Sequence, residues 1–278
     1  MKIAAVRVGI VGGRGAMGSW FKKFFKAHGC IVNIAGRNTV LTPKELAKRS
    51  DILIVSVPID AAVGTIKEIA PHVSEGCMLA DFTSLKEKTV AAMLKYSRKG
   101  VEVAGIHPMF GPTVRSVRGQ AVLLVPGRGG KWFNWLKRMI KKGGGRVKEL
   151  SAKDHDKLVA IVQALTHFSL ISTSHALREL GVDVDESLQC STPIYKINLA
   201  LMGRVLGQDP KMYADIEMLN PHGRAAIKKY AEIVKSLQQT VEKGDATSFT
   251  REFDKTSSFL GAYKKKAMKQ SDALIESL

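Results

Sequence analysis

The sequence has few cysteines, few acidic residues for its many basic ones, and no long uncharged apolar run. Of its 278 residues only 3 are cysteines, Cys30, Cys77 and Cys190, and they form no Cys-x-x-Cys pair. Isolated cysteines in odd number support neither a disulfide framework nor a thiolate metal site, and they are typical of a reducing compartment such as the cytoplasm. No uncharged stretch approaches the ~18 residues that a spanning helix needs, so we expect no membrane segment.

Acidic residues are scarce in the first half alone. Residues 1–150 hold 26 Lys and Arg against 9 Asp and Glu, whereas residues 151–278 hold 17 against 16. This asymmetry predicts two domains, the first of which meets something anionic. One alternative is a solvated basic face that serves solubility. Another is a nucleotide-sensing protein that binds nucleic acid, which is disfavoured because no helix-turn-helix or aromatic-basic platform is present.

The order of apolar patterns predicts an α/β half followed by an all-helical half. Short β-branched runs alternate with helical segments up to Leu150, which is typical of a parallel sheet covered by helices on both faces. Beyond Leu150 the strand pattern stops and helical periodicity continues to the end. We therefore place the domains at residues 1–150 and 151–278. The strands are expected at residues 6–11, 31–35, 51–57, 77–82, 101–106 and 120–125.

A glycine-rich loop follows the first predicted strand directly. Gly13-Arg14-Gly15-Ala16-Met17-Gly18 fits G-x-G-x-x-G at a strand-to-helix turn. Glycines permit this tight turn and let backbone N–H groups approach a pyrophosphate at the positive end of the helix. Because a helix and a second strand follow, the motif predicts a Rossmann-like dinucleotide-binding domain. The six loop residues, Gly13, Arg14, Gly15, Ala16, Met17 and Gly18, are candidate cofactor ligands.

The end of the second predicted strand indicates which dinucleotide is bound. An acidic residue about 20 positions beyond the fingerprint normally holds the ribose hydroxyls of NAD. This sequence has Gly36-Arg37-Asn38 there instead. The planar guanidinium of Arg37 suits a 2′-phosphate, so Arg37 and Asn38 predict a preference for NADP over NAD. The alternative is that Arg37 is an ordinary surface arginine.

An uncommon string lies where a later strand of the sheet ends. In Ile106-His107-Pro108-Met109-Phe110-Gly111-Pro112 the two prolines and the glycine predict that His107 is held in an irregular loop. The string resembles the H-P-M-F-G-P loop of prephenate and arogenate dehydrogenases. Other stretches agree with this family and cover most of the chain: Asp81-Phe82-Thr83-Ser84-Leu85-Lys86, Gln163-Ala164-Leu165-Thr166-His167-Phe168, Ser191-Thr192-Pro193-Ile194-Tyr195, Met202-Gly203-Arg204, Gln208-Asp209-Pro210 and Tyr213-Ala214-Asp215-Ile216.

The resemblance implies a reaction and a catalytic pair. In this family a cyclohexadienol loses hydride to the nicotinamide and carbon dioxide from its ring, and a helical domain forms a homodimer. His107 then accepts the proton of the ring hydroxyl, a task that suits an imidazole with a pKa near neutrality. Ser84 matches the serine that lies near this histidine and the nicotinamide. From the residues alone, Ser84 reads equally well as a helix cap.

Four residues of the helical half are candidate substrate ligands. Arg204 is the only charge in an apolar stretch, where a guanidinium is costly without an anionic partner, and the resemblance places a substrate carboxylate there. Lys196 is a second candidate contact for a carboxylate, and Gln163 and His167 share a helix face. The structural alternatives are an ion pair for Arg204 and an interhelical hydrogen bond for His167. His155 and His167 lack metal-ligand spacing, so no metal site is expected.

Together these features predict an enzyme that acts on prephenate with NADP, with NAD as the second cofactor. Arogenate, which carries an ammonium in place of the side-chain keto group, is the alternative substrate. The sequence does not show which acids line the pocket. We expect a homodimer through residues 151–278, and no fused chorismate mutase or regulatory domain.

Overall fold

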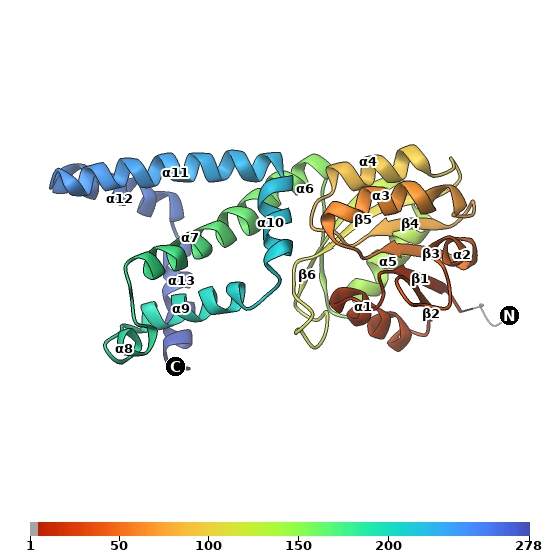
Figure 1. Ribbon diagram of the computed structural model, residues 1–278, viewed down its shortest axis with the longest axis horizontal. Helices are drawn as coiled ribbons and strands as arrows, with labels where there is room; N and C mark the ends of the chain where they lie inside the picture. Colours follow the sequence, from red (N-terminus) through yellow and green to blue (C-terminus); the bar gives the residue numbers. More distant parts are fainter. Residues whose placement is uncertain (1–4) are drawn as a thin grey trace. The chain divides into compact units, whose positions relative to one another are not determined.

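The structure, a computed structural model, describes residues 5–278. The chain divides into two compact units, one ending at Val159 and one beginning at Ala160 (Figure 1). The helix α6 (Ala152–Val159) therefore belongs by its contacts to the first unit, although the sequence pattern changes after residue 150. Each unit is described by itself below.

The first unit is built on a seven-stranded sheet of order β2-β1-β3-β4-β5-β6-β7 within the described residues. The neighbours from β2 to β5 are parallel. The strands are β1 (Arg7–Val11), β2 (Ile31–Ala35), β3 (Ile52–Val55), β4 (Met78–Asp81), β5 (Glu102–Pro108), β6 (Ala121–Arg128) and β7 (Arg146–Glu149). This confirms the α/β fold with a Rossmann-like first half.

The prediction of an all-parallel sheet is wrong at β6, which runs antiparallel to β5. The segment between these two strands holds no helix. Parallel neighbours need a long crossover connection, whereas antiparallel neighbours can be joined by a simple loop. The last strand, β7, pairs parallel with β6 and was not predicted.

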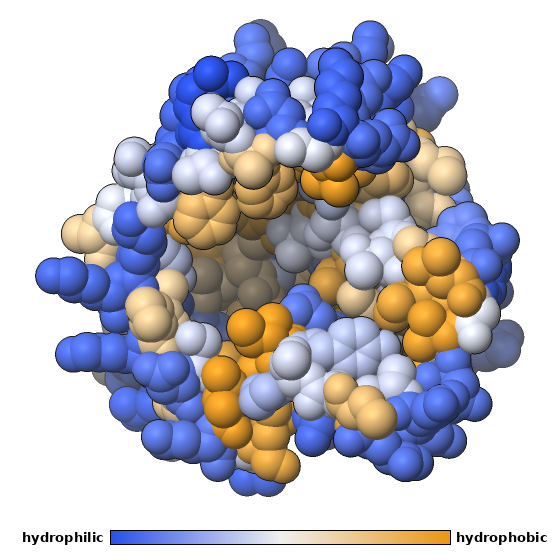
Figure 2. Space-filling model, turned by 90° about the vertical axis from the view of Figure 1, so that its left-hand side faces the viewer, coloured by the Kyte–Doolittle hydropathy of each residue, from blue (hydrophilic) through white to orange (hydrophobic). Residues whose placement is uncertain are grey.

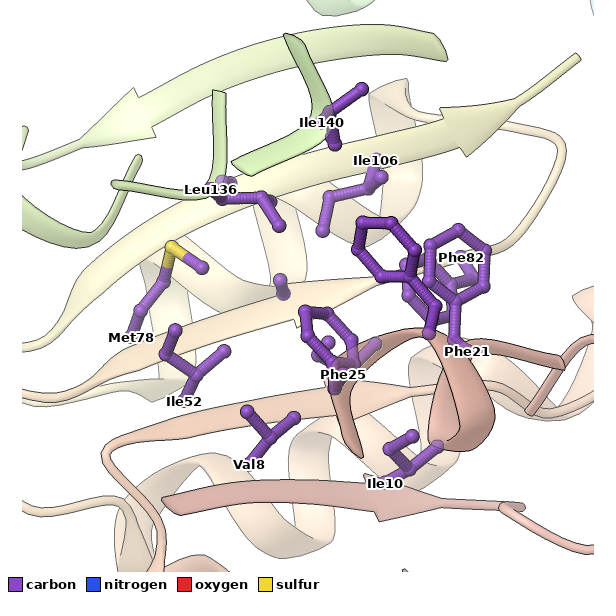
Figure 3. Packing of buried hydrophobic residues seen from close by; sticks show 14 of the residues in the cluster. Val8, Ile10, Phe21, Phe25, Ile52, Met78, Phe82, Ile106, Leu136 and Ile140 are labelled. Carbon is purple, nitrogen blue, oxygen red and sulfur yellow. The ribbon is translucent and has the colours of Figure 1, made fainter. Parts of the chain in front are cut away.

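Helices cover both faces of the sheet. The core on one face packs under α1 and α5, and the core on the other face under α2, α3 and α4. Figure 3 shows Phe21 and Phe25 of α1 against Ile52, Met78 and Ile106 of the strands. The helices are α1 (Ala16–Ala27), α2 (Pro43–Arg49), α3 (Ile59–Ile69), α4 (Glu87–Tyr96) and α5 (Lys131–Lys142), with a short 3-10 turn at Ala70–His72.

Local sequence explains two of these helices. Phe21, Phe24 and Phe25 recur on one face of α1 and are buried, and Gly29, with φ +80°, follows its end. Burial of each such ring contributes about 1.5–3 kcal/mol. In α2 a capping box is present, because Thr42 accepts the N–H of Glu45 while Glu45 accepts the N–H of Thr42.

The second unit is entirely helical, as predicted. It begins with a π-helical turn, Ala160–Leu165, that leads into α7 without a break. Side-chain caps start several helices: Asp183, Thr192, Asp209, Asn220 and Asp245 each accept a backbone N–H. The helices are α7 (Thr166–Glu179), α8 (Val184–Gln189), α9 (Pro193–Leu206), α10 (Pro210–Leu219), α11 (Pro221–Glu242), α12 (Ala246–Leu260) and α13 (Tyr263–Ile275).

The helical unit leaves much apolar surface uncovered. Its buried hydrophobic residues are Ala160, Ala164, Met202, Val205, Tyr213 and Ile216. Many large apolar side chains remain exposed, with Phe259 86% exposed and Phe253 65% exposed. Figure 2 looks onto this unit and shows hydrophobic side chains around a central hollow. Among residues 5–278 no helix has the length and apolar character needed to cross a bilayer.

Candidate active site

The glycine loop joins β1 to α1 in a space that admits no side chain at several positions. A Cβ on Gly13 would lie 2.3 Å from Cγ2 of Ile34, and one on Gly18 would lie 2.6 Å from the carbonyl oxygen of Gly12. Gly12 itself has φ +83°, in the left-handed region that favours glycine. The fingerprint glycines therefore set the close approach of α1 to the sheet.

The start of α1 suits an anionic group. Gly15 is the N-cap residue, α1 begins at Ala16, and within the described chain the first turn carries no acidic residue and no side-chain cap. Arg14, Gly15 and Ala16 are exposed there, while Met17 is half-buried. Unpartnered N–H groups and the helix dipole make such a turn a site for phosphate. The predicted loop residues fit a dinucleotide on this observation.

The turn after β2 holds the two residues predicted to select the cofactor. Arg37 and Asn38 are both exposed, and Asn38 has φ +60°. The hydroxyl of Thr39 accepts the N–H of Gly36 at 2.9 Å, which closes the turn around them. Asparagine tolerates the left-handed conformation better than most residues. No carboxylate follows β2 at the position where NAD-binding domains usually carry one.

The glycine loop and the catalytic candidate lie at the same edge of the sheet. Because β1, β2, β4 and β5 are parallel, the loops that follow them share the carboxyl edge, where open α/β sheets bind ligands. The segment after β5 also contacts α1. The indole of Trp20 donates to the carbonyl oxygen of Val114 at 2.6 Å and meets the ring of Phe110 edge-on at 5.0 Å.

His107 lies inside β5 rather than in an irregular loop, so that part of the prediction is wrong. It faces Leu123 of β6 in the antiparallel register. The residue before a proline is restricted to extended conformations, and a strand satisfies this restriction. His107 is buried, and burial, with the nearby His155 and Lys86, lowers its pKa well below the usual range for histidine. The environment therefore favours the neutral imidazole, and the expectation of a pKa near neutrality is not met.

Two further buried side chains extend from His107. Its Nδ1 lies 2.9 Å from Nε2 of His155, and Nδ1 of His155 lies 2.8 Å from Oδ1 of Asp156. Both partners are on α6, and both are buried. Burial also lowers the pKa of His155, against the opposite effect of its hydrogen bond to Asp156. A His-His-Asp chain thus reaches from β5 to α6 within the first unit.

The Asp156 carboxylate also caps α4. It accepts the backbone N–H of Lys86 at 2.8 Å and that of Glu87 at 3.0 Å. Lys86 is the N-cap residue of α4, and half-buried Ser84 lies two positions before it. The structure therefore assigns the cap to Asp156, and the alternative reading of Ser84 as a helix cap is wrong.

A buried ion pair lies beside this cap. Nζ of Lys86 contacts Oδ2 of Asp81 at 2.6 Å, and both side chains are fully buried. The hydroxyl of Thr83 contacts the same carboxylate oxygen. Burial lowers the pKa of Lys86, and Asp81 and Asp156 oppose that shift. Asp81 closes β4, so the pair fixes the loop that carries Ser84 to the sheet edge.

The four predicted substrate ligands all belong to the helical unit. Gln163 lies in the π-helical turn, and His167 is in the first turn of α7. The ring of His167 meets that of Tyr213 edge-on at 4.9 Å, and burial lowers its pKa. Its Nδ1 atom has no hydrogen-bond partner among the described residues. Within residues 5–278 no three potential metal ligands come together.

Arg204 and Lys196 are exposed side chains of α9. The expectation that Arg204 lies in apolar surroundings is not met within one chain, because α9 buries only Met202 and Val205. The amide of Gln208 bridges from the carbonyl oxygen of Arg204, at 2.8 Å, to the hydroxyl of Tyr213, at 3.0 Å. The apolar sequence of α9 therefore reflects exposed apolar surface rather than a buried helix.

An apolar cavity of about 590 Å³ lies among α7, α9, α10 and α11. Glu217 contributes a carboxyl group to it, and neither oxygen has a hydrogen-bond partner in the described residues. Burial raises the pKa of Glu217 to about 7. The lining residues are Phe168, Ile171, Val205, Leu206, Gln208, Pro210, Tyr213, Ala214, Glu217, Met218, Arg224, Ile227 and Lys228.

Comparison with known families places both halves of the chain. Residues 32–149 match the model of the prephenate dehydrogenase nucleotide-binding domain, and residues 151–255 match the prephenate dehydrogenase dimerization domain. The chain belongs to the prephenate dehydrogenase family. It is therefore related to oxidoreductases that act on prephenate or arogenate.

Individual relatives agree. The chain is 36% identical to a probable arogenate/prephenate dehydrogenase of Methanocaldococcus jannaschii over 100% of its own length and 66% of the relative's. It is 34% identical to the T-protein of Enterobacter agglomerans over 96% of this chain and 71% of that protein. The chain thus spans about two thirds of the length of these relatives.

A solved structure supports the fold of this prephenate dehydrogenase family member. The prephenate dehydrogenase of Aquifex aeolicus, solved with hydroxyphenyl propionate and NAD+, superposes with a TM-score of 0.71 at 20% identity. The match covers 97% of this chain and 99% of that one. At this identity the likeness shows the fold alone.

Sequence reasoning missed His155, Asp156 and the buried Lys86 as parts of the site. One signal was present in α6, where the buried face holds His155, Asp156 and Val159. Two titratable residues on the buried face of a short helix indicate a polar partner in the core. The partner itself was not visible, because His107 lies 48 positions away in sequence.

Proposed function

We propose that this chain is an NADP-dependent dehydrogenase that converts prephenate to 4-hydroxyphenylpyruvate with loss of carbon dioxide. Membership of the family supports the reaction class. The observation that carries the proposal is the position of His107, a buried neutral imidazole at the sheet edge that also bears the glycine loop. A general base and a dinucleotide site on one edge are what such an oxidation requires.

His107 has a defined task in this proposal. A nicotinamide dinucleotide held by the glycine loop would supply the hydride acceptor for the ring carbon that bears the hydroxyl group. His107 takes the proton of that hydroxyl, which becomes carbonyl-like. The ring carboxylate then leaves as carbon dioxide, the electron pair of its carbon–carbon bond enters the ring, and the ring becomes aromatic. Ser84, on the loop after β4, is proposed to act beside His107.

The second unit is proposed to bind the anionic substrate. Arg204 is assigned to a substrate carboxylate, because its guanidinium is exposed and offers a planar pair of donors. Lys196, on the same helix, is proposed as a second carboxylate contact. Gln163 and His167 are proposed as further substrate contacts. The free side of the His167 ring, at Nδ1, is available for a hydrogen bond.

Arg37 and Asn38 are proposed to select NADP. A 2′-phosphate offers three acceptor oxygens, and a guanidinium meets them with charge-assisted hydrogen bonds. The first unit is also the strongly basic part of the chain, because residues 1–150 carry the excess of Lys and Arg. Its field favours the more highly charged dinucleotide. NAD is the weaker cofactor in this proposal.

We further propose that the helical unit forms a homodimer. Exposed apolar side chains are spread over α9, α11, α12 and α13, which is more apolar surface than a monomer usually shows. A two-fold contact between identical faces is the simplest way to cover it. A monomeric mass by light scattering at micromolar protein, with full activity, would contradict this assembly.

Steady-state kinetics test the activity directly. NADPH or NADH formation is followed by absorbance with prephenate and with arogenate, each offered with NADP and with NAD. The proposal expects the highest catalytic efficiency with prephenate and NADP. A higher efficiency with arogenate would make the chain an arogenate dehydrogenase, and the absence of turnover with either dienol would overturn the proposed function.

A further inference from the structure

The His107-His155-Asp156 chain contains enough hydrogen bonds to determine where its protons lie. Asp156 accepts two backbone N–H groups at the start of α4, one on each carboxylate oxygen. Backbone N–H groups can only donate. The positive end of the α4 dipole further favours the ionised carboxylate. Asp156 is thus an acceptor in each of these contacts, as an ionised carboxylate must be.

The state of Asp156 fixes the tautomer of His155. Because Asp156 accepts, Nδ1 of His155 must carry the proton in their 2.8 Å hydrogen bond. A neutral imidazole has one N–H and one lone pair, so Nε2 of His155 is then an acceptor. Burial favours this neutral form, and so does the charge of Lys86. The 0% exposure of the His155 side chain keeps water from supplying another proton.

The tautomer of His155 in turn determines the tautomer of His107. Nε2 of His155 accepts, so Nδ1 of His107 must donate across the 2.9 Å contact. The lone pair of the neutral His107 ring is therefore on Nε2. Among the charged groups in this cluster, Lys86 is paired with Asp81, and Asp156 is the carboxylate at the end of the chain.

We propose that His155, held by Asp156, is a positioning residue that fixes His107 in the tautomer whose Nε2 accepts the substrate proton. This inference rests on the proposed function, in which His107 is the base. The chain also stabilises the product of that step. Once His107 is an imidazolium, its Nδ1–H still donates to His155, and the negative charge of Asp156 lies one ring further away. A carboxylate-oriented histidine base is an established way to fix a tautomer in other enzymes.

Asp156→Asn removes the negative charge of Asp156 and replaces one acceptor oxygen by a donor, with little change in side-chain volume. Oδ1 of Asp156 faces both Nδ1 of His155 and the N–H of Lys86, and Oδ2 accepts the N–H of Glu87, so in either orientation the NH₂ of the new amide meets a backbone N–H donor. The variant therefore cannot keep both the α4 cap and the acceptor that holds the proton on Nδ1 of His155. We expect kcat to fall by roughly 10²- to 10⁴-fold, as for loss of a general base. KM for prephenate and the dissociation constant of NADP should change less than about threefold, because no ligand contact is removed.

A pair of variants at His155 separates positioning from packing. In His155→Gln the side-chain amide can accept from His107 and donate to Asp156, so this variant should keep most of the wild-type activity. His155→Leu fills similar space without an acceptor and should lose activity as Asp156→Asn does. A purely structural role for His155 predicts that both variants lose activity in proportion to their loss of thermal stability, which would overturn the proposal.

The ring nitrogens can be observed without any substrate. Long-range ¹H–¹⁵N spectra of histidine-labelled wild-type protein distinguish the two neutral tautomers, and His107→Asn identifies the signals of His107. We expect both His107 and His155 to carry their protons on Nδ1. A proton on Nε2 of His107 overturns the inference even if prephenate is the substrate. If the tautomers are as expected and no dienol is turned over, the proposed function fails instead.

Discussion

The two units of this chain differ in how completely each buries its own apolar side chains. In the first unit Phe21 is 1% exposed and lies in a continuous core on one sheet face, and a second core fills the other face. In the second unit α7, α8, α12 and α13 contain no buried residue. The first unit closes on itself, whereas the second has the surface of a structure that is completed by association.

The units also differ in the kind of polar group that they bury. The first unit buries paired groups, such as Lys86 with Asp81 and His155 with Asp156, although Oδ1 of Asp81 has no hydrogen-bond partner among the described residues. The second leaves Glu217 and one nitrogen of His167 without partners among the described residues. Buried polar groups are normally satisfied, and those that are not often mark places where a ligand or another chain binds. In the proposed function, the first unit supplies the base and the second unit binds the substrate.

The largest expected effect tests this division of labour. His107→Asn should lower kcat by roughly 10²- to 10⁴-fold, because it removes the base. KM should change little, and NADP affinity should be retained. Arg204→Gln should act in the opposite way and mainly raise KM for prephenate. Steady-state kinetics on both variants measure the split, and loss of the same parameter to the same degree in both would refute it.

A matched pair of phenylalanine substitutions tests the difference in core. Phe21→Ala should destabilise the first unit by about 3–5 kcal/mol, since it leaves a cavity in a closed core. Phe253→Ala removes a ring that is 65% exposed in one chain. We expect it to weaken dimerisation instead, so that it lowers the melting temperature more at low protein concentration than at high concentration. Calorimetry at two concentrations measures both, and equal concentration-independent losses would contradict the comparison.

A smaller effect is expected for cofactor choice, which is proposed to depend on Arg37 in the first unit. Arg37→Asp should reverse the preference for NADP, which we expect to be roughly ten- to hundredfold from charge-assisted hydrogen bonds of ~1.5–3 kcal/mol. Arg146→Asp, at the opposite end of the sheet on β7, is the control for net charge. The ratio of kcat/KM for NADP and NAD is measured for both variants. If the wild type has the same kcat/KM with NAD as with NADP, Arg37 is an ordinary surface arginine that does not select the cofactor.

The smallest effect concerns Glu217 in the cavity of the second unit. Burial raises its pKa from 4.5 to about 7, so its contribution to stability is fully present below pH 4.5 and is lost as the pH rises through about 7. The group is partly exposed, so we expect a loss on the order of 1 kcal/mol. Glu217→Gln should remove this pH dependence. Melting temperatures of both proteins at pH 5 and pH 8 check it, and parallel pH profiles would count against it.

Sequence patterns predicted the first unit well where each element buries a face of its own. The strand at Ile31–Ala35 was predicted with the observed bounds, and the sequence itself carries the apolar stripe of α1 and the capping box of α2. The strand β7 was missed because Arg146–Glu149 is short, mostly exposed and charged. Its pairing with β6 is a long-range contact that no local pattern encodes.

The candidate site was predictable only for the residues with distinctive strings. His107 and the glycine loop stand in such strings, whereas His155 and Asp156 acquire their roles from contacts 48 and 70 positions away. The exposure of Arg204 was misjudged because apolar neighbours on α9 were taken to mean burial. An apolar helix that is exposed in one chain can have the same composition as a helix that is buried within its own chain.

The hydrogen bond from Lys86 to Asp156 spans 70 positions of sequence and has a consequence for synthesis on the ribosome. The strands from β1 to β5 and α4 emerge first and can assemble as a sheet while the rest of the chain is still being made. The start of α4 remains without its cap, and His107 without its neighbour, until α6 has emerged. Contacts between residues that are so far apart in the sequence form late in folding. The nascent sheet is thus expected to gain the ability to hold a nucleotide before it can gain an oriented base.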